Sequence, residues 1–352
     1  MKIYIITQNF PPSIGGIQTV MYSIAKDLSS MGNEVFVFPD HWFKEVNSFK
    51  VKNIIAPKFF RHYIKRLLLS INGKEESIVI CDTWKSVNAV PKKFKNIVLF
   101  AHGQEYLKLK NKKRILSSLL RAKLLIASSK YSCDLIKNNW IIPHLNINVL
   151  YPTYHIKKLP FKKINLNEVT KFISICRIEK RKGLLQSLIS LKEIELKGHD
   201  FIWDIIGNGP QLNELKQKCF ELNLEKKVFF HGKVKSNKIK NNFLENSDIF
   251  LMPTFQDNYS IEGFGLTYIE AARFGIPSIA GVSGGSSEAV IDGKTGWCVD
   301  PNNNDQLIRI IENSLVNTKE RRQFGNNALK RFEKEINGEN AIQKLFNFLN
   351  QL

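Results

Sequence analysis

Short β-like runs alternate with helical patterns along the whole chain, and this alternation restricts the fold more than any other feature of the sequence. Parallel strands need a long crossover, usually a helix, so the pattern predicts an α/β protein with parallel sheets. The strand-like runs form two series, which we predict at residues 2–7, 34–38, 77–81, 97–101, 124–127 and 148–151, and then at 171–176, 202–206, 228–231, 249–253, 278–280 and 296–299. A length of 352 residues fits two domains, and we expect two Rossmann-like domains facing each other across a cleft.

The stretch between the two series is polar and rich in lysine, which is typical of a linker. We therefore predict a first domain over residues 1–155, a linker over 156–170 and a second domain over 171–325. The final segment, 326–352, has a helical pattern with one charged and one apolar face. Further helical patterns are predicted at 20–31, 184–197, 211–222, 236–246 and 266–274.

The net charge of +20 is concentrated in the first 150 residues, where 23 Lys and Arg stand against 9 Asp and Glu. A surplus of this size favours an anionic neighbour, such as nucleic acid, an acidic glycan or the face of an anionic membrane. Residues 58–69 mix bulky apolar and basic side chains at helical spacing. This pattern fits a helix lying in a lipid interface, or an ordinary amphipathic helix packed on its own domain.

The five cysteines are widely spaced and form no C-x-x-C pair, so we expect buried thiols in a reducing compartment. No apolar run approaches the roughly 18 residues that a membrane-spanning helix needs, and the start does not resemble a signal peptide. We expect a cytoplasmic protein at the inner face of the cytoplasmic membrane. Since the sequence contains no D-x-D motif and no His/Cys cluster with ligand spacing, we also expect no protein-held metal and no cofactor.

Two carboxylates, Glu262 and Glu270, bracket a Gly-x-Gly turn at the predicted start of a helix. Gly263 and Gly265 allow a ligand to approach the backbone, and the helix beginning near Leu266 directs N–H groups toward it. This arrangement suits a diphosphate, with the carboxylates holding hydroxyl groups, and the two features together describe a nucleotide sugar. The alternatives are a solvated turn, or an acid and base pair as in a glycosidase.

Arg177 and Lys182 follow the first predicted strand of the second domain, where parallel sheets bind ligands. Two cations there could hold a diphosphate and neutralise its charge as it leaves, although a solvated basic loop would look the same. The run Gly207-Asn208-Gly209 follows the next strand and opens a helix. Such a turn permits close approach of a phosphate or base, but it is common.

Two features of the first domain lie at predicted strand ends. Gly15 and Gly16 precede a helix, where they could bind a phosphate or the polar head of an acceptor. His102 follows the strand at 97–101 and could hydrogen-bond a sugar hydroxyl, transfer a proton, or cap a turn.

Together these motifs resemble the retaining glycosyltransferases of the GT-B fold, family 4. The resemblance covers nearly the full chain and depends on the order and spacing of several short motifs. These are Pro11-Pro12 with Gly15-Gly16, Arg177 with Lys182-Gly183, Gly207-Asn208-Gly209-Pro210, Glu262-Gly263-Phe264-Gly265-Leu266 with Glu270-Ala271, Ser283-Gly284-Gly285 with Glu288, and Asp292-Gly293-Lys294-Thr295-Gly296.

The resemblance implies that a hexose passes from a UDP- or GDP-linked donor to a hydroxyl of a lipid-linked or cell-surface glycan, of the lipopolysaccharide, capsule or O-antigen type. Retention of the anomeric configuration and a final helix that crosses back to the first domain are implied as well. It assigns catalytic roles to Arg177, Lys182, Glu262 and His102, donor binding to Gly207, Asn208, Gly209, Gly263, Phe264, Gly265, Leu266 and Glu270, and the acceptor side to Gly15 and Gly16. Within this set, Glu270 would hold the ribose and Glu262 the donor sugar.

The chain departs from the family pattern at two places. Tyr151-Pro152-Thr153-Tyr154 replaces the usual Asn-Gly, and the segment 255–260 before Glu262 is longer than in many members, which leaves the sugar open. Another GT-B enzyme, such as a sugar-nucleotide epimerase or a phosphorylase, would need water-activating carboxylates or a cofactor lysine, and neither is apparent. A basic nucleic-acid-binding protein is the further alternative, but no recognised binding module is present.

Overall fold

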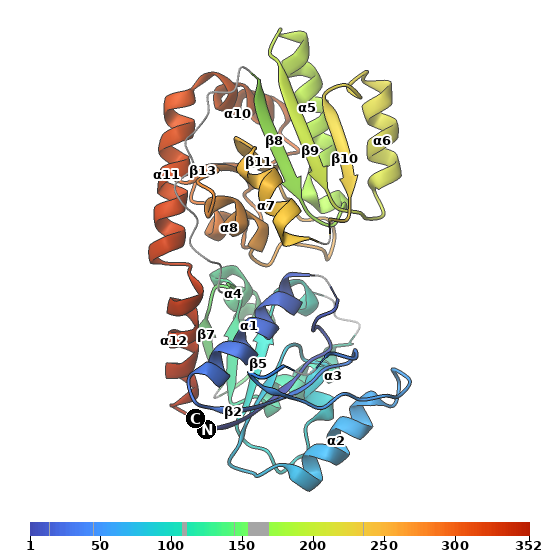
Figure 1. Ribbon diagram of the computed structural model, residues 1–352, viewed down its shortest axis with the longest axis vertical. Coiled ribbons are helices and arrows are strands. Elements are labelled where there is room, and N and C mark those ends of the chain that lie inside the picture. Colours follow the sequence, from blue (N-terminus) through green and yellow to red (C-terminus); the bar gives the residue numbers. More distant parts are fainter. Residues whose placement is uncertain (14, 45, 108–110, 144, 154–168, 235) are drawn as a thin grey trace. The chain divides into compact units, whose positions relative to one another are not determined.

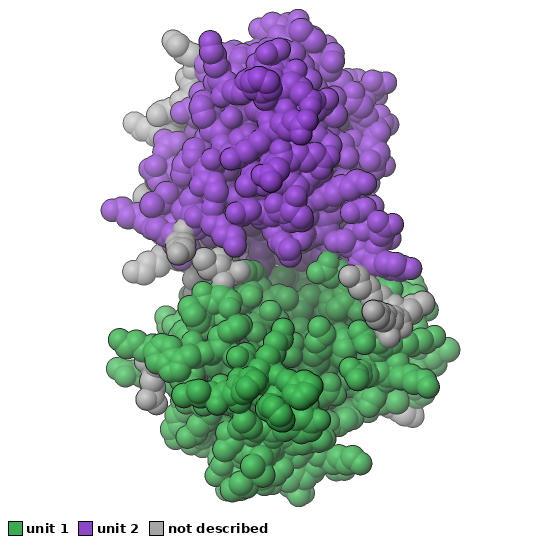
Figure 2. All heavy atoms as spheres, turned by 90° about the vertical axis from the view of Figure 1, so that its right-hand side faces the viewer, with its two compact units in different colours: residues 1–156, 337–352 green, residues 157–336 purple. Residues whose placement is uncertain are grey.

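The computed structural model describes residues 1–13, 15–44, 46–107, 111–143, 145–153, 169–234 and 236–352. The chain divides into two compact units (Figure 2): residues 1–156 with 337–352 form unit 1, and residues 157–336 form unit 2. The predicted linker, 156–170, lies outside the described residues except for its last two positions. The predicted cleft between the two units stays a prediction.

Unit 1 is built on a seven-stranded parallel sheet with the strand order β3-β2-β1-β4-β5-β6-β7. Its strands are β1 (Lys2–Ile6), β2 (Glu34–Phe38), β3 (Lys50–Val51), β4 (Ile78–Cys81), β5 (Ile97–Ala101), β6 (Leu124–Ala127) and β7 (Asn146–Val149). In the centre of the sheet, Ile3 lies opposite Val35 on one side and Ile78 on the other. The central strands are nearly all apolar because helices cover both faces of such a sheet.

In the described part of unit 1, five helices accompany this sheet: α1 (Gly16–Ser30), α2 (Arg61–Asn72), α3 (Lys112–Arg121), α4 (Lys130–Asn139) and α12 (Gly338–Leu349). The 3-10 turns η1 (Ser86–Ala89) and η2 (Gln104–Tyr106) also belong to unit 1. Helix α12 comes from the C-terminal end of the chain and packs against α1 (Figure 1), with Leu345 and Leu349 fully buried. At the end of the chain, Lys123 Nζ donates a hydrogen bond of 2.5 Å to the carbonyl of Leu352.

Unit 2 has a six-stranded parallel sheet with the order β10-β9-β8-β11-β12-β13. Its strands are β8 (Thr170–Ile175), β9 (Phe201–Ile206), β10 (Val228–Gly232), β11 (Ile249–Met252), β12 (Ser278–Gly281) and β13 (Gly296–Val299). Its helices are α5 (Leu184–Leu196), α6 (Leu212–Glu221), α7 (Asn237–Glu245), α8 (Leu266–Ala272), α9 (Ser286–Ala289), α10 (Asn304–Val316) and α11 (Thr318–Lys334), with a 3-10 turn η4 (Lys180–Lys182). These two sheets confirm the predicted α/β class with two Rossmann-like domains.

The strand order of each sheet reverses once, between β1 and β4 in unit 1 and between β8 and β11 in unit 2. In open parallel sheets, ligands bind beyond the carboxyl ends of the strands at such a switch point. The fold therefore directs attention to the segments that follow these four strands.

The C-terminal tail differs from the prediction of one helical segment over 326–352. The structure divides it into α11 and α12, because Asn337 begins a new helix by accepting a 2.8 Å hydrogen bond from the backbone N–H of Asn340. Helix α11 stays with unit 2, where the guanidinium of Arg331 donates to the carbonyls of Ala289 at 2.7 Å and Glu288 at 2.6 Å. The boundary thus lies at residue 337 and not at 326.

None of the helices within the described ranges is long and apolar enough to cross a membrane.

Arg321 fastens α11 to the start of the sheet, since its buried guanidinium donates to Thr170 Oγ1 and to the carbonyl of Ser314, both at 3.1 Å. We expect Arg321→Ala to lower the stability of unit 2 by about 1–3 kcal/mol, because two buried acceptors lose their donor. The neighbouring Arg322 is exposed, and Arg322→Ala should change stability by less than about 0.5 kcal/mol. Thermal unfolding followed by circular dichroism compares the two variants, and equal melting temperatures would contradict the anchoring role.

Candidate active site

The candidate site in unit 2 is formed by the segments that follow β8 and β11, the neighbouring strands at the switch point. The segment after β8 contains Arg177 and Lys182, and the segment after β11 contains Glu262 and continues into α8. The fold thus brings together two motifs that lie about eighty residues apart in the sequence, as the bond between Lys182 and Glu262 shows.

The carboxylate of Glu262 binds two cations. Its Oε2 accepts a 2.7 Å hydrogen bond from Nη1 of Arg181 and a further bond from the ammonium of Lys182. All three side chains are largely buried, with exposed fractions of 12% for Arg181, 8% for Lys182 and 14% for Glu262. Burial in a low-dielectric environment strengthens such an ion pair and makes an unpaired charge costly.

The pKa of Glu262 reflects this environment. Burial alone would raise it, but the positive charges of Lys182 and Arg181 outweigh that effect and lower the pKa to about 2. Glu262 is therefore ionised at neutral pH and can only accept hydrogen bonds. A carboxyl group of this acidity does not fit the general acid of a glycosidase-type pair, because the general acid must be protonated near the working pH.

Arg177 lies at the edge of this cluster and not within it. Its side chain is 71% exposed, and its Nε forms an ion pair with Oε1 of Glu179 at 3.1 Å. Glu179 also contacts Nε of Arg181 at 3.3 Å. Arg181 was not predicted as a site residue, because a run of five charged residues among six, 177–182, does not show which side chains turn inward. The turn η4 makes that selection: it leaves Lys180 exposed and buries Lys182.

A left-handed glycine allows the two segments to meet. Gly183 follows η4 with a φ of +70°, and a Cβ atom there would lie 2.1 Å from the carbonyl oxygen of Pro253, at the end of β11. Any other residue would push the segment with Lys182 away from the segment with Glu262. The predicted pair Lys182-Gly183 is thus one unit, in which the glycine positions the cation.

The predicted glycine turn after β9 packs against the same segment. Ile178 N–H donates to the carbonyl of Asn208 at 3.1 Å, and a Cβ on Gly209 would lie 2.1 Å from the carbonyl oxygen of Ile178. Gly207 is similarly close to the backbone of Cys176. In this structure these residues support the segment after β8; their predicted contact with the donor stays a prediction.

The loop from Gly263 to Leu266 leads into α8. Gly265 precedes the helix with a φ of +95°, and Phe264 is buried. Helix α8 is fixed to the sheet by Tyr268, whose buried hydroxyl donates to the carbonyl of Met252 at 2.5 Å. The N–H of Gly285 donates to the carbonyl of Glu262 at 2.9 Å, so the motif Ser283-Gly284-Gly285 holds the backbone at the start of this loop.

Glu270 lies on α8 and is bound by a residue that the sequence did not single out. Both of its carboxylate oxygens accept hydrogen bonds of 3.0 Å from Nζ of Lys240, which belongs to α7. The Glu270 side chain is 12% exposed and that of Lys240 is 21% exposed. A lysine in the predicted helix 236–246 gives no sign in the sequence of which carboxylate it will meet.

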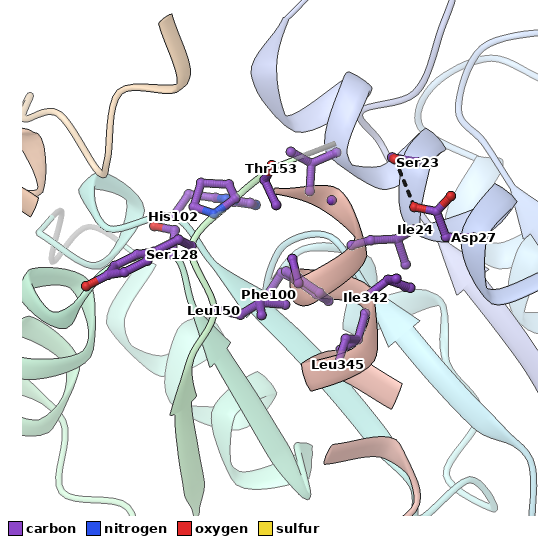
Figure 3. A pocket seen from close by; sticks show the side chains of 15 residues that line it. Ser23, Ile24, Asp27, Phe100, His102, Ser128, Leu150, Thr153, Ile342 and Leu345 are labelled. Atoms are coloured by element: carbon purple, nitrogen blue, oxygen red, sulfur yellow. Dashed lines mark hydrogen bonds between the residues drawn. The ribbon is translucent and has the colours of Figure 1, made fainter. Parts of the chain in front are cut away.

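In unit 1, His102 follows β5 and lines a mainly apolar pocket between α1, the ends of the strands and α12 (Figure 3). Phe100, Leu150 and Ile342 lie around it. Nε2 of His102 is 2.9 Å from the carbonyl oxygen of Asp82, and since a carbonyl can only accept, Nε2 carries the proton. In neutral His102 the other ring nitrogen, Nδ1, is therefore a hydrogen-bond acceptor.

Asp82 was also not predicted, although it directly follows β4 at the switch point of unit 1. It is fully buried, and its Oδ2 accepts hydrogen bonds of 2.9–3.0 Å from Thr7 Oγ1, the N–H groups of Gln8 and Asn9, and the Asn9 side chain. Asp82 thus anchors the segment that leads toward Gly15 and Gly16, at the start of α1.

Comparison with known proteins identifies the family. The model for "Glycosyl transferases group 1" matches residues 156–331, half of the chain. The chain belongs to this family. A GDP-mannose-dependent alpha-(1-6)-phosphatidylinositol monomannoside mannosyltransferase of Mycolicibacterium smegmatis is 29% identical over 157 residues, which are 44% of this chain and 41% of that protein. A putative colanic acid biosynthesis glycosyltransferase of Salmonella typhimurium is 30% identical over 148 residues, 42% of this chain and 36% of that protein. The chain thus spans less than half the length of these relatives.

The likeness to a solved structure of the same fold extends over nearly the whole chain. Sucrose-phosphate synthase from Thermosynechococcus elongatus aligns with 99% of this chain and 98% of its own at a TM-score of 0.83, with 17% sequence identity. This likeness confirms the predicted fold class over both units. Within the described residues, no group of three or more His, Cys, Asp or Glu side chains is placed to hold a metal ion.

The low pKa of Glu262 predicts that the free energy of unfolding decreases in acid. A carboxyl group whose pKa falls from the ordinary 4.5 to about 2 on folding contributes stability above pH 4.5, and this contribution is lost as the pH falls toward 2. We expect the wild type to lose up to about 3 kcal/mol through this group across that range. Glu262→Gln should lack this part of the pH dependence, whereas Glu214→Gln, which changes an exposed carboxylate, should keep it. Urea unfolding at pH 6, 4 and 3 measures the difference, and parallel curves for the two variants would exclude the ion-pair account.

Proposed function

We propose that this chain transfers a hexose from a UDP- or GDP-linked donor to a hydroxyl of a lipid-linked or cell-surface glycan, with retention of the anomeric configuration and without a protein-held metal or cofactor. The observation that carries the proposal is the buried carboxylate of Glu262 bound to Arg181 and Lys182 at the switch point of unit 2. The names of the relatives support it, since one denotes a GDP-mannose-dependent transferase acting on a phosphatidylinositol mannoside and another a colanic acid glycosyltransferase.

The charges of the site suit a diphosphate. Arg177, Arg181 and Lys182 face two carboxylates, Glu179 and Glu262, which leaves one positive charge in excess. Because Arg177 is mostly exposed, its guanidinium can turn toward a ligand with little rearrangement. Cations fixed in advance stabilise the charge that develops on a leaving diphosphate, without a metal ion.

In the proposed reaction the acceptor hydroxyl oxygen attacks the anomeric carbon on the face from which the diphosphate departs. The bond between this carbon and the phosphate oxygen breaks, and the hydroxyl proton passes to the leaving diphosphate. Lys182 and Arg177 would stabilise the departing charge, and the ionised Glu262 would accept hydrogen bonds from hydroxyls of the sugar. In this reaction no carboxylate has to act as a nucleophile.

Glu270 is proposed to hold the ribose of the donor. The two hydrogen bonds from Lys240 orient its carboxyl group, so that ribose hydroxyls can donate to the same oxygens. Gly263, Phe264, Gly265 and Leu266 would offer backbone N–H groups to the donor, as the family resemblance implies.

The site of action is proposed to be the cytoplasmic face of an anionic membrane. The surplus of 23 basic over 9 acidic residues in the first 150 positions favours an anionic surface. His102, Gly15 and Gly16, all in unit 1, are proposed to serve the sugar and acceptor side.

Lys182 provides the most direct test of the proposed chemistry. We expect Lys182→Ala to lower kcat by about 10²- to 10³-fold, because one preorganised cation at the leaving group is lost. Lys180→Ala, in the same turn but exposed, is the matched control and should stay within about twofold of wild type. The assay follows release of UDP or GDP from a panel of UDP- and GDP-sugars in excess EDTA, with lipid-linked glycan extracts as acceptors.

Equal rates for the two lysine variants would contradict the role of Lys182, and dependence on added metal would contradict the metal-free mechanism. Conversion of the donor to an epimer without consumption of acceptor would favour the epimerase alternative. The coupling constant of the anomeric proton in the product shows whether the configuration is retained.

The proposed contact between Glu270 and the ribose predicts a loss of nucleotide affinity when the carboxyl group is removed. Glu270→Ala should raise the Kd of the matching nucleoside diphosphate by about 10- to 100-fold, because two charge-assisted hydrogen bonds are lost. Wild type should bind the 2′,3′-dideoxy nucleotide about as weakly as the variant binds the ribonucleotide. Calorimetric titration of both proteins with both nucleotides forms a double-mutant cycle, and additive losses would mean that Glu270 does not contact the ribose.

A further inference from the structure

Helix α2 of unit 1 exposes an apolar surface to solvent. Phe59, Tyr63, Leu67 and Ile71 recur every four residues, and their exposed fractions are 72%, 58%, 59% and 70%. Phe60 adds a further ring that is 51% exposed. Tyr63, Leu67 and Ile71 are spaced by four within α2 and therefore lie on one side of the helix. Phe59 and Phe60 lie in the turn that precedes α2, with their ring centroids 5.1 Å apart. We call these five side chains the α2 stripe.

The opposite face of α2 is fixed to unit 1. Leu69 is fully buried, and Ile64 and Leu68 pack against the hydrophobic core. The ammonium of Lys65 is buried and donates to Asp40 Oδ1 at 2.5 Å and to the carbonyl of Thr7 at 3.0 Å. Turning the helix inward would break this ion pair and expose the core residues.

The C-terminal end of α2 is also held. Lys93 Nζ donates hydrogen bonds of 2.8 Å to the carbonyls of Ser70 and Gly73. The α2 stripe is therefore presented to solvent by the packing of the helix and does not result from a loosely attached segment. Contiguous exposed apolar patches mark interaction surfaces, whereas single apolar residues scattered over a surface are ordinary.

The surroundings of the stripe are basic. No Asp or Glu occurs in the sequence from Val46 to Lys74, whereas Glu75 and Glu76 follow it. Lys58 is exposed at the start of the helix and Arg66 is half-buried beside the stripe. Turn η1 packs against both α2 and α3, and exposed basic side chains occur there too: Lys85, Lys112, Lys113 and Arg114.

We propose that the α2 stripe docks unit 1 onto an anionic lipid bilayer. The apolar side chains would enter the headgroup region, and the basic residues around them would lie against lipid phosphates. With 12 residues, α2 is about 18 Å long and would lie in the plane of the membrane. The role of this docking rests on the proposed function, because a lipid-linked acceptor lies at a membrane surface. The binding of α2 to lipid requires neither donor nor acceptor.

Vesicle cosedimentation of the full chain tests this surface. We expect binding to phosphatidylcholine vesicles that contain 30% phosphatidylglycerol, and at least tenfold weaker binding to phosphatidylcholine alone. Leu67→Ser with Ile71→Ser should weaken binding about tenfold or more, since two apolar side chains no longer enter the bilayer. Leu196→Ser with Phe220→Ser, which removes two exposed apolar side chains of unit 2, is the matched control and should bind as the wild type does.

A charge-reversal pair forms the second arm. Lys58→Glu with Arg66→Glu should weaken binding to anionic vesicles at least tenfold, and Lys319→Glu with Lys330→Glu on α11 should change it less than threefold. All variants must keep the circular dichroism spectrum and melting temperature of wild type. Donor hydrolysis in detergent-free buffer should be unchanged in the α2 variants, so loss of docking is distinguished from failure of the proposed chemistry.

Two outcomes would overturn the proposal. One is equal sedimentation of wild type and the α2 variants with anionic vesicles. The other is a wild-type dimer in analytical ultracentrifugation that dissociates in Leu67→Ser with Ile71→Ser while wild type does not bind vesicles, which would assign the stripe to contact between two copies of the chain.

Discussion

The carboxylate of Glu262 binds two cations from adjacent positions, Arg181 and Lys182, and all three side chains are largely buried. Without the carboxylate the two positive charges would repel each other and neither could stay buried. Its main-chain carbonyl also receives the N–H of Gly285, so three segments converge on one residue. The arrangement of the segments after β8 and β11 depends on this contact, and the three side chains together carry one positive charge in excess.

Each unit has a buried carboxylate near its switch point, and the two differ in the groups that donate hydrogen bonds to it. Asp82 in unit 1 is satisfied by neutral donors from residues 7–9 and by Ser86 Oγ at 2.5 Å, so it fixes the course of the backbone. Glu262 in unit 2 is satisfied by cations instead. Hydrogen bonds from neutral donors provide rigidity, whereas a group of paired charges provides both rigidity and an electrostatic field. The same sheet topology thus supports a carboxylate held by neutral donors in one unit and a buried ion-pair cluster in the other.

The sequence predicted the strands well because their apolar runs are short and bounded by polar turns. The ranges 34–38, 97–101, 124–127 and 296–299 agree with the structure to the residue, whereas the strand predicted at 148–151 lies at Asn146–Val149. It also located Lys182 and Glu262, since glycines mark both segments. It could not identify Arg181, Lys240 or Asp82, because their roles depend on which partner tertiary packing brings to them. The local sequence around a charged residue in a charged run, or around a lysine on a helix, does not indicate which partner it will contact.

The return of residues 337–352 to unit 1 makes unit 2 an insertion within unit 1. The family model matches residues 156–331, nearly the same interval. Exchange of unit 2 between related genes would therefore require two junctions, one near residue 156 and one near 337, and both ends of the chain would stay with the recipient. Recombination with a single crossover would instead separate α12 from the α1 surface on which it packs, so such a hybrid would begin with a mismatched helix interface.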